Sequence, residues 1–263
     1  HTFWPQTYCR NHYFNRDSSI CCSCTKLEGK NESFVPLDEG RVLCLECLDS
    51  AIMDTLQCQP LYIDVQEFYE AMNMKLSQQV PLLIVDRKAL NEAKIHGRIG
   101  GDEGETRGLT MTEIAEVQTI MERPRGDGSI RRVPIKLTQQ AEITAILVIY
   151  GLPRLHTGAI LAHELMHAWL HLNGYLSLRP EIEEGMCQVM GRIWLEAEIA
   201  RLSDGSSSGG SPFEKKLGVF FLFQMAASPD PIYGGGFRRC NDAVMRHGLR
   251  KTLDVLGRTN DLP

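Results

Sequence analysis

Apolar side chains recur at helical spacing over most of the chain after residue 61. The clearest case is segment 64–76, DVQEFYEAMNMKL, in which apolar residues repeat every three or four positions. Asp64 and Glu67 are placed as a variant of a capping box at its start. The same periodicity predicts helices over 87–95, 158–173, 181–202, 213–227 and 241–256. The pattern therefore predicts a mostly helical unit.

Two short apolar segments have the pattern of buried strands. VPLLIVD (80–86) is short and uninterrupted, and ITAILVIYG (143–151) is β-branched and wholly apolar, which is typical of an interior strand. Stretches rich in glycine or serine at 96–108 and 203–212 predict two long loops. Helices and strands together indicate an α+β fold that is mostly helical with a small β-sheet.

Composition and charge exclude several classes of function. The 263 residues carry a net charge of -5, which argues against binding to nucleic acid or to anionic membranes. The longest apolar run, 217–227, is too short for the roughly 20 residues that span a bilayer. The first residues do not resemble a signal sequence, and the start looks like a fragment boundary. We therefore expect protein partners, with no nucleic acid and no membrane.

Six of the nine cysteines lie within the first 47 residues. Two CxxC pairs separated by nineteen residues predict a structural zinc site: Cys21, Cys24, Cys44 and Cys47. Cys22 is an extra thiol that could replace Cys21, and Cys9-x2-His12 looks like half of another zinc site. The pattern favours reduced thiolates and an intracellular, cytoplasmic or nuclear location. It predicts a zinc-binding unit over 1–58 that ends in a short helix near 48–56, followed by a second unit over 61–263.

The sequence HELMH at 163–167 indicates a catalytic metal site. It lies within GAILAHELMHAWLHLNGY, whose apolar face and Asn-Gly stop predict a helix. Histidines four residues apart project from one side of a helix, so His163 and His167 can bind one Zn²⁺. Glu164 lies beside them and can act as the general base that activates a water molecule. The alternative is a chance match on a helix face, which the helical context and the acidic pair downstream disfavour.

A catalytic zinc usually has a third protein ligand. Helix 181–202 opens with RPEIEEG, and a glutamate followed by glycine in its first turn makes Glu184 the predicted third ligand. Glu183 is the alternative, or it orients a zinc-bound histidine. Taken alone, either carboxylate could also be a solvated residue that the helix dipole favours. His171, one turn after His167, is expected to be an outer or surface residue.

The side chains that could stabilise an oxyanion are weaker candidates, and most of them are expected to be structural. They are Tyr150, His156, Tyr175, Tyr233, Arg238 and His247.

With both metal motifs in view, nearly the whole chain resembles the C-terminal part of the plant LIM-domain peptidases, a ubiquitin-regulated family that restrains organ and seed size. The resemblance is carried by RVLCLECLDSAIMDTLQCQPLY, VPLLIVDRKALNEA, TAILVIYGLPRL, LAHELMHAWLHLNGY, RPEIEEGMCQV and GLRKTL. It implies an N-terminally truncated LIM-like zinc module followed by a metallopeptidase domain of the glutamate-zincin type. His163, Glu164, His167 and Glu184 occupy the family's metal and base positions.

The resemblance also implies that the substrates are intracellular regulatory proteins and that the partners include ubiquitin and E3 ubiquitin ligases. The leading hypothesis is a zinc endopeptidase that makes limited cleavages, with one catalytic and at least one structural Zn²⁺. One alternative is a LIM-type interaction scaffold with a weak or inactive peptidase-like domain. Another is a zinc aminopeptidase, for which no amine-binding motif is recognisable.

Overall fold

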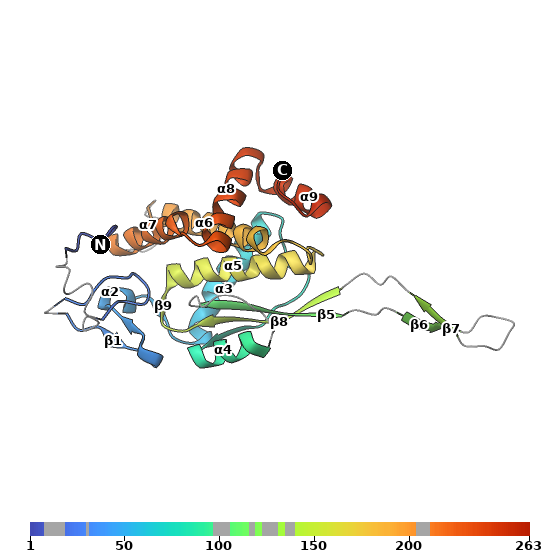
Figure 1. The fold of residues 1–263 in the computed structure, drawn as a ribbon. Helices are drawn as coiled ribbons and strands as arrows, with labels where there is room; N and C mark the ends of the chain where they lie inside the picture. Colours follow the sequence, from blue (N-terminus) through green and yellow to red (C-terminus); the bar gives the residue numbers. More distant parts are fainter. Residues whose placement is uncertain are drawn as a thin grey trace.

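The chain forms helical layers on both faces of a small sheet. The computed structural model describes residues 1–7, 19–29, 32–96, 106–115, 119–122, 131–134, 140–203 and 211–263. In Figure 1, α4 lies on one face of the sheet and α3 and α5 on the other, with α6, α7 and α8 outside α5. The mixed helical and β structure confirms the α+β prediction.

Strand β8 (Gln140–Ile149) is the centre of a three-stranded sheet. It pairs with β4 (Leu82–Val85) in parallel and with β5 (Gly108–Ala115) antiparallel on the other side. Successive side chains enter opposite layers: Val148 joins the core beneath α5, and Leu147 packs with Leu90 of α4. Because both faces are covered, residues 145–149 of the strand are all buried and apolar, whereas the polar Gln140, Glu142 and Thr144 lie in its first half.

Three predicted helices are confirmed on either side of this sheet. They are α4 (Arg87–His96), α5 (Arg154–Leu172) and α6 (Pro180–Ser203). Helix α5 begins earlier than expected because it follows directly on β9 (Leu152–Pro153), whose Pro153 is the N-cap residue. Helices α5 and α6 approach closely, since an added methyl group at Gly158 would lie 2.0 Å from the Trp194 ring. Only glycine permits this contact.

Helix α3 (Thr55–Ala71) begins well before the predicted start at residue 64, and the capping box predicted at Asp64 and Glu67 is wrong. The cap is Asp54, whose side chain accepts a hydrogen bond from the Gln57 backbone at 2.8 Å. Pro60 lies inside the helix and removes one backbone hydrogen bond. Burial of the apolar face along the whole helix offsets that loss.

The short helix predicted near 48–56 is also wrong. The chain there forms β3 (Ala51–Ile52), which pairs antiparallel with β9. It continues through Asp54 directly into α3, so the boundary expected between residues 58 and 61 lies within one continuous helix.

The C-terminal part packs against α6. Helix α7 (Pro212–Ala227) confirms the predicted helix, and Ser211 caps it. A π-helical turn, η2 (Pro231–Gly235), then leads into α8 (Gly236–His247) and α9 (Leu249–Thr259). The single helix predicted over 241–256 is wrong, because Gly248 adopts a φ of 81° and separates α8 from α9.

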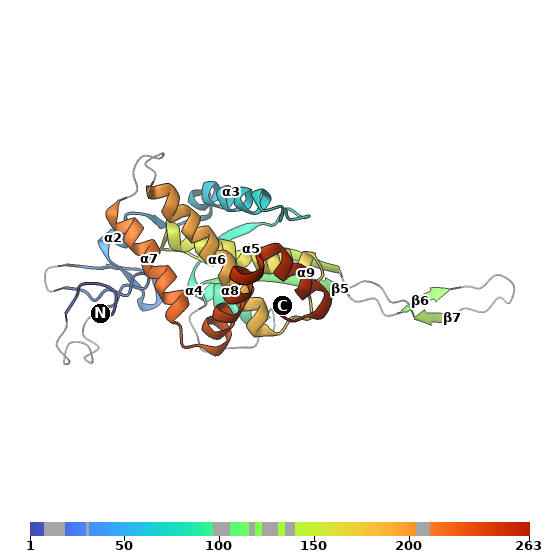
Figure 2. The same cartoon turned by 90° about the horizontal axis from the view of Figure 1, so that it is seen from above.

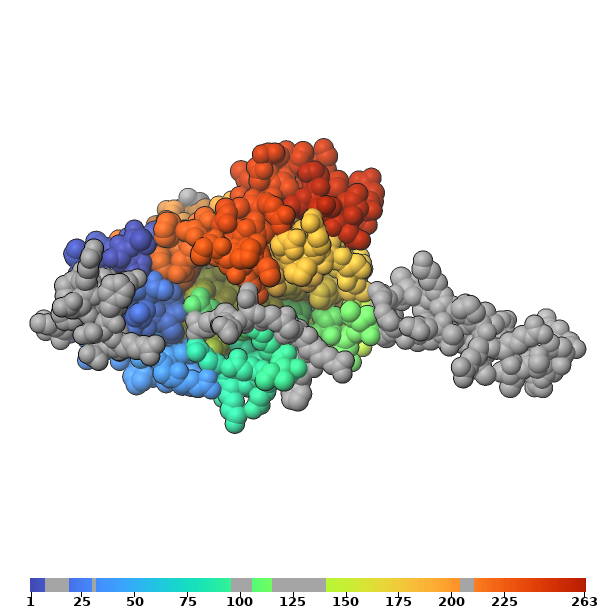
Figure 3. All heavy atoms as spheres, in the orientation of Figure 1, coloured from blue at the N-terminus to red at the C-terminus, as the bar shows by residue number. Residues whose placement is uncertain are grey.

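The N-terminal unit shares its hydrophobic core with the helices. It contains β1 (Val35–Pro36), η1 (Asp38–Gly40), β2 (Val42–Leu43) and α2 (Leu45–Leu48). Trp4 stacks on Phe213 of α7, with 5.7 Å between ring centroids, and packs on Phe220. Figure 3 shows the N-terminal residues, in dark blue, against α7, in orange. The first residues are therefore part of the helical body.

Strands β6 (Thr119–Glu122) and β7 (Arg131–Pro134) pair with each other and lie apart from the helical layers (Figures 1 and 2). Most of the two predicted loops, residues 97–105 and 204–210, lies outside the described residues. Among the residues that are described, no helix is long and apolar enough to cross a membrane.

Candidate metal centres and active site

Helix α5 places the HELMH side chains on the side that faces α6 and β5. His163 and His167 are half-buried, and their Nε2 atoms lie 3.2 Å apart. Glu164 is buried, with 5% of its surface exposed. The two imidazole rings thus converge on one point while the carboxylate between them points toward β5.

Glu184, which follows the first turn of α6, faces both imidazole rings. Its Oε2 lies 3.2 Å from His163 Nε2 and 3.6 Å from His167 Nε2. This buried oxygen accepts no hydrogen bond from the residues that the structure describes. Donor atoms about 2.0–2.1 Å from a tetrahedral zinc ion lie about 3.3 Å from one another. The spacing of the three atoms therefore suits a shared zinc ion.

Cys187, one turn further along α6, is the rival for this position. Its Sγ also lies within 4.8 Å of ring nitrogens of His163 and His167. Burial raises the pKa of the Cys187 thiol to about 12. Burial also raises the pKa of Glu184, but the two histidines outweigh that effect and hold it well below its usual range. Because a ligand must be deprotonated, Glu184 is the stronger candidate.

Glu183 contacts the opposite side of the His167 ring. Its Oε1 lies 2.8 Å from His167 Nδ1 and 2.9 Å from His171 Nε2. Burial raises the pKa of Glu183, but the two histidines lower it to about 2, so the carboxylate is ionised and can only accept. His167 Nδ1 must then carry a hydrogen, and Nε2 is the ring nitrogen that faces the candidate metal position, where a zinc ion would take the place of a proton.

Strand β5 supplies two residues around Glu164 that sequence reasoning missed. Thr110 Oγ1 donates to Glu164 Oε2 at 2.8 Å. An added methyl group at Gly108 would lie 2.5 Å from Glu164 Oε1, so only glycine leaves room for this carboxylate. No local motif distinguishes Gly108 or Thr110, because their role depends on the pairing of β5 with β8.

The structure gives contacts for several of the oxyanion candidates. The Tyr150 hydroxyl accepts a hydrogen bond from Asp38 N, and the Tyr175 hydroxyl donates one to Leu253 O. Arg238 donates to the carbonyl oxygens of Ala226 and Ser228. The His156 ring is buried against Phe221. Tyr233 lies on η2, and His247 ends α8.

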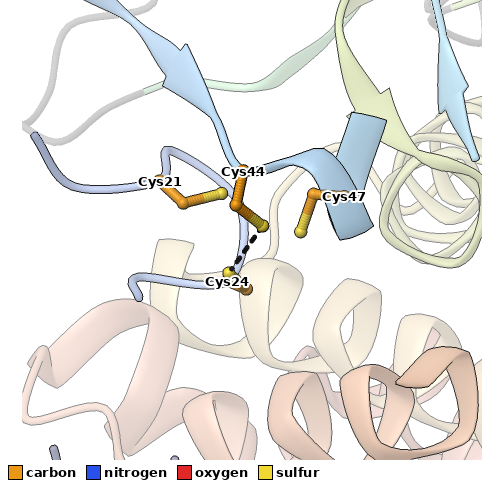
Figure 4. A group of neighbouring side chains, drawn as sticks. All are labelled: Cys21, Cys24, Cys44 and Cys47. Atoms are coloured by element: carbon orange, nitrogen blue, oxygen red, sulfur yellow. Dashed lines mark hydrogen bonds between the residues drawn. The ribbon is translucent and has the colours of Figure 1, made fainter. Parts of the chain in front are cut away.

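The predicted structural site lies in the N-terminal unit. Its four sulfur atoms lie within 4.8 Å of one another and come from buried residues: Cys21, Cys24, Cys44 and Cys47 (Figure 4). The sulfurs of Cys24 and Cys44 are 3.6 Å apart, close to the roughly 3.8 Å that a tetrahedral zinc ion with Zn–S bonds of about 2.3 Å requires. This cluster could bind zinc and is compatible with a LIM-like module.

Cys21, and not the neighbouring Cys22, belongs to this cluster, and Cys22 is half-buried outside it. The thiols of Cys24, Cys44 and Cys47 lower the pKa of Cys21. Such a shift favours the thiolate form that binds metal.

One buried hydrogen bond joins the cysteine cluster to helix α5, and another joins it to Trp4, which packs against α7. Ser23, between two of the cysteines, lies 3.3 Å from His156 Nδ1 on α5, and the Trp4 indole donates to Cys24 O at 2.7 Å. Burial lowers the pKa of His156 well below its usual value, so this ring is neutral. The remaining predicted half-site, Cys9 and His12, lies outside the described residues.

Comparison with known proteins identifies a family. A family model described as "DA1-like: Protein DA1" matches residues 71–259. Over 287 residues the chain is 49% identical to Protein DA1-related 1 of Arabidopsis thaliana, covering 100% of this chain and 51% of that protein. It is 48% identical to Protein DA1 of the same plant over 283 residues (100% and 53%). It is 49% identical to LIM domain-containing protein HDR3 of Oryza sativa subsp. japonica over 290 residues (100% and 58%).

The chain spans about half the length of these relatives. No solved structure matches it significantly.

Proposed function

Since the chain belongs to the DA1-like family of plant LIM-domain proteins, as its sequence resemblance predicted, we propose that it is a zinc-dependent endopeptidase. One observation carries this proposal. The buried Glu184 Oε2 and the Nε2 atoms of His163 and His167 converge without a hydrogen bond to that oxygen from the described residues. Three such atoms beside a buried carboxylate form the ligand set and base of a zinc hydrolase.

The residues divide the work as follows. His163, His167 and Glu184 would hold the zinc, and Glu183 would orient His167 through Nδ1. When bound, zinc acidifies a water molecule and polarises the peptide carbonyl. Glu164 takes the proton from the attacking water and delivers it to the leaving amine. Thr110 holds Oε2 of Glu164, and this fixes the direction in which the carboxylate presents its other oxygen.

The four-cysteine cluster would hold a second zinc with a structural role. Four protein ligands leave no open position for water, so this site folds the chain and does no chemistry. The eight cysteines among the described residues are free thiols. Reduced thiols suit an intracellular location, cytoplasmic or nuclear.

The substrate proposal rests on the family resemblance. We propose that the protein makes limited cleavages in intracellular regulatory proteins as part of ubiquitin-linked growth control, and that its partners are ubiquitin and E3 ligases. Because the chain spans about half of its relatives, these partners are proposed for the whole protein.

The variant Glu164→Gln tests the mechanism. It keeps the side-chain shape and removes the base, so we expect full zinc content and a loss of about 10²–10⁴-fold in kcat. Glu196→Gln, an exposed glutamate of α6, is the matched control and should retain full activity. Wild-type rates in Glu164→Gln with zinc in place would refute the assigned base.

A peptide with a blocked N-terminus separates the two kinds of peptidase, because an aminopeptidase leaves it intact. A protein that binds both zinc ions and cleaves no substrate would favour the interaction scaffold.

A further inference from the structure

A continuous row of hydrogen bonds runs from β5 to the candidate zinc ligand His167. Thr112 Oγ1 lies 2.8 Å from His171 Nδ1. His171 Nε2 lies 2.9 Å from Glu183 Oε1, and the same oxygen lies 2.8 Å from His167 Nδ1. The row therefore joins β5, α5 and α6 at one side of the centre.

The direction of each hydrogen bond follows from the geometry, because a single oxygen, Glu183 Oε1, lies within hydrogen-bond distance of two ring nitrogens. A carboxylate can only accept, so His167 Nδ1 and His171 Nε2 both donate to it. In a neutral ring, His171 Nδ1 is then an acceptor, and its donor is the hydroxyl of Thr112. With both rings neutral, each hydrogen bond in the row has one donor and one acceptor, and Nε2 of His167 is the nitrogen that faces the candidate metal position.

We propose that Thr112 and His171 are positioning residues that hold Glu183, and through it His167, in the metal-binding orientation. The partners of a ligating histidine commonly fix its ring and raise its basicity. Here the row reaches beyond the carboxylate to a strand in another layer of the fold. This inference rests on the proposed zinc centre and concerns its affinity for metal, so cleavage need not be measured.

A second metal ion is the rival explanation for this cluster. Ring nitrogens of His167 and His171 and an oxygen of Glu183 lie close enough to share an ion. The separations of 2.8 and 2.9 Å, however, are hydrogen-bond lengths. They are shorter than the roughly 3.3 Å between donors of a tetrahedral zinc ion, which the 3.2 and 3.6 Å contacts of Glu184 approach. The distances favour hydrogen bonds.

The experiment measures zinc retained by the 263-residue chain across a series of chelator concentrations. Thr112→Val removes the hydroxyl with little change in shape, and Thr112→Ser retains it. His171→Phe removes both ring nitrogens. Thr157→Val is the matched control, because this buried threonine of α5 bonds to Leu152 O. Glu184→Ala should lack the zinc of the proposed centre. It therefore shows how the zinc of the four-cysteine cluster (the thiolate zinc) is released as the chelator concentration rises.

We expect His171→Phe to weaken binding at the centre by about 10-fold and Thr112→Val by about 5-fold. Thr112→Ser and Thr157→Val should match the wild type, and the thiolate zinc should be unchanged in all variants. Thermal unfolding checks that each variant folds. If His171→Phe does not fold, the zinc affinity of Thr112→Val alone tests the inference.

Wild-type affinity in Thr112→Val would overturn the inference. So would the loss of one full zinc equivalent from His171→Phe at saturating zinc, since His171 would then be a ligand. A wild-type chain that binds a single zinc ion, that of the four-cysteine cluster, would instead refute the proposed centre itself.

Discussion

Thr110 Oγ1 lies 2.8 Å from Glu164 Oε2 and 2.9 Å from the backbone oxygen of the same residue. Both residues are buried. A threonine hydroxyl has one proton, so a single donor serves the side chain and the main chain of Glu164 together. The proposed base is therefore fixed relative to its own helix by a residue of another layer.

We expect Thr110→Val to lower kcat by about 10-fold to 100-fold, with little change in KM or zinc content. A hydrogen bond to a charged group contributes about 1.5–3 kcal/mol, which corresponds to that range of rates. Steady-state kinetics and metal analysis measure both quantities. Thr110→Ser should recover the wild-type rate, and Thr157→Val controls for loss of a buried hydroxyl on α5. An unchanged kcat in Thr110→Val would show that Glu164 needs no such support.

The candidate ligand Glu184 was predictable because the signals for it are local. HELMH and EEG lie on strongly periodic segments, and the positions along each helix determine which side chains share a face. Thr110 and Thr112 carry no such signal. Their segment follows a glycine-rich stretch, and their roles arise from the pairing of β5 with β8, which brings distant parts of the chain together.

Helix α3 shows why local rules misplace boundaries. The helical pattern predicts a start at Asp64, whereas the observed cap is Asp54, and Pro60 lies between them. Burial determines where the helix begins, because Cys58 and Leu61, on either side of the proline, pack in the core. That burial depends on tertiary contacts and is invisible in a window of sequence.

We expect Glu184→Ala to lose the zinc of the centre even at saturating metal, because a ligand is removed. Glu183→Ala should still bind zinc, about 10–100-fold more weakly, because only the orientation of His167 is lost. Cys187→Ala should bind as the wild type does. Metal analysis after dialysis against graded zinc distinguishes the three. Retention of zinc by Glu184→Ala together with its loss from Cys187→Ala would assign the thiol as the ligand.

Glu198 of α6 predicts a pH dependence of stability. Its carboxylate accepts hydrogen bonds from Arg154 at 2.9 Å and from Arg201 at 2.8 Å. Burial raises the pKa of Glu198, but the two arginines outweigh burial and lower it. The stabilisation is therefore present above the unfolded pKa of about 4.3 and is lost as the pH falls through the lower folded value.

We expect Glu198→Gln to reduce the free energy of unfolding at pH 7 by about 1.5–3 kcal/mol. The difference from the wild type should shrink as the solution becomes acidic. Urea unfolding between neutral and acidic pH measures it. Glu196→Gln, whose exposed pair with Arg192 contributes less than about 1 kcal/mol, is the control on the same helix. A difference that stays constant with pH would contradict the assigned charge.

The cysteine cluster and helix α5 should unfold together, because Ser23 contacts His156 of α5 and the cluster lies in the shared core. We expect Cys44→Ser to lose the structural zinc and to lower the free energy of unfolding by about 4 kcal/mol or more. The thermal transition should remain single and shift to lower temperature. Cys22→Ser, which alters a half-buried thiol outside the cluster, should change stability by about 1 kcal/mol at most. Calorimetry with zinc analysis tests this. A Cys44→Ser protein that keeps the main wild-type transition and unfolds only its N-terminal unit would show that the unit is independent.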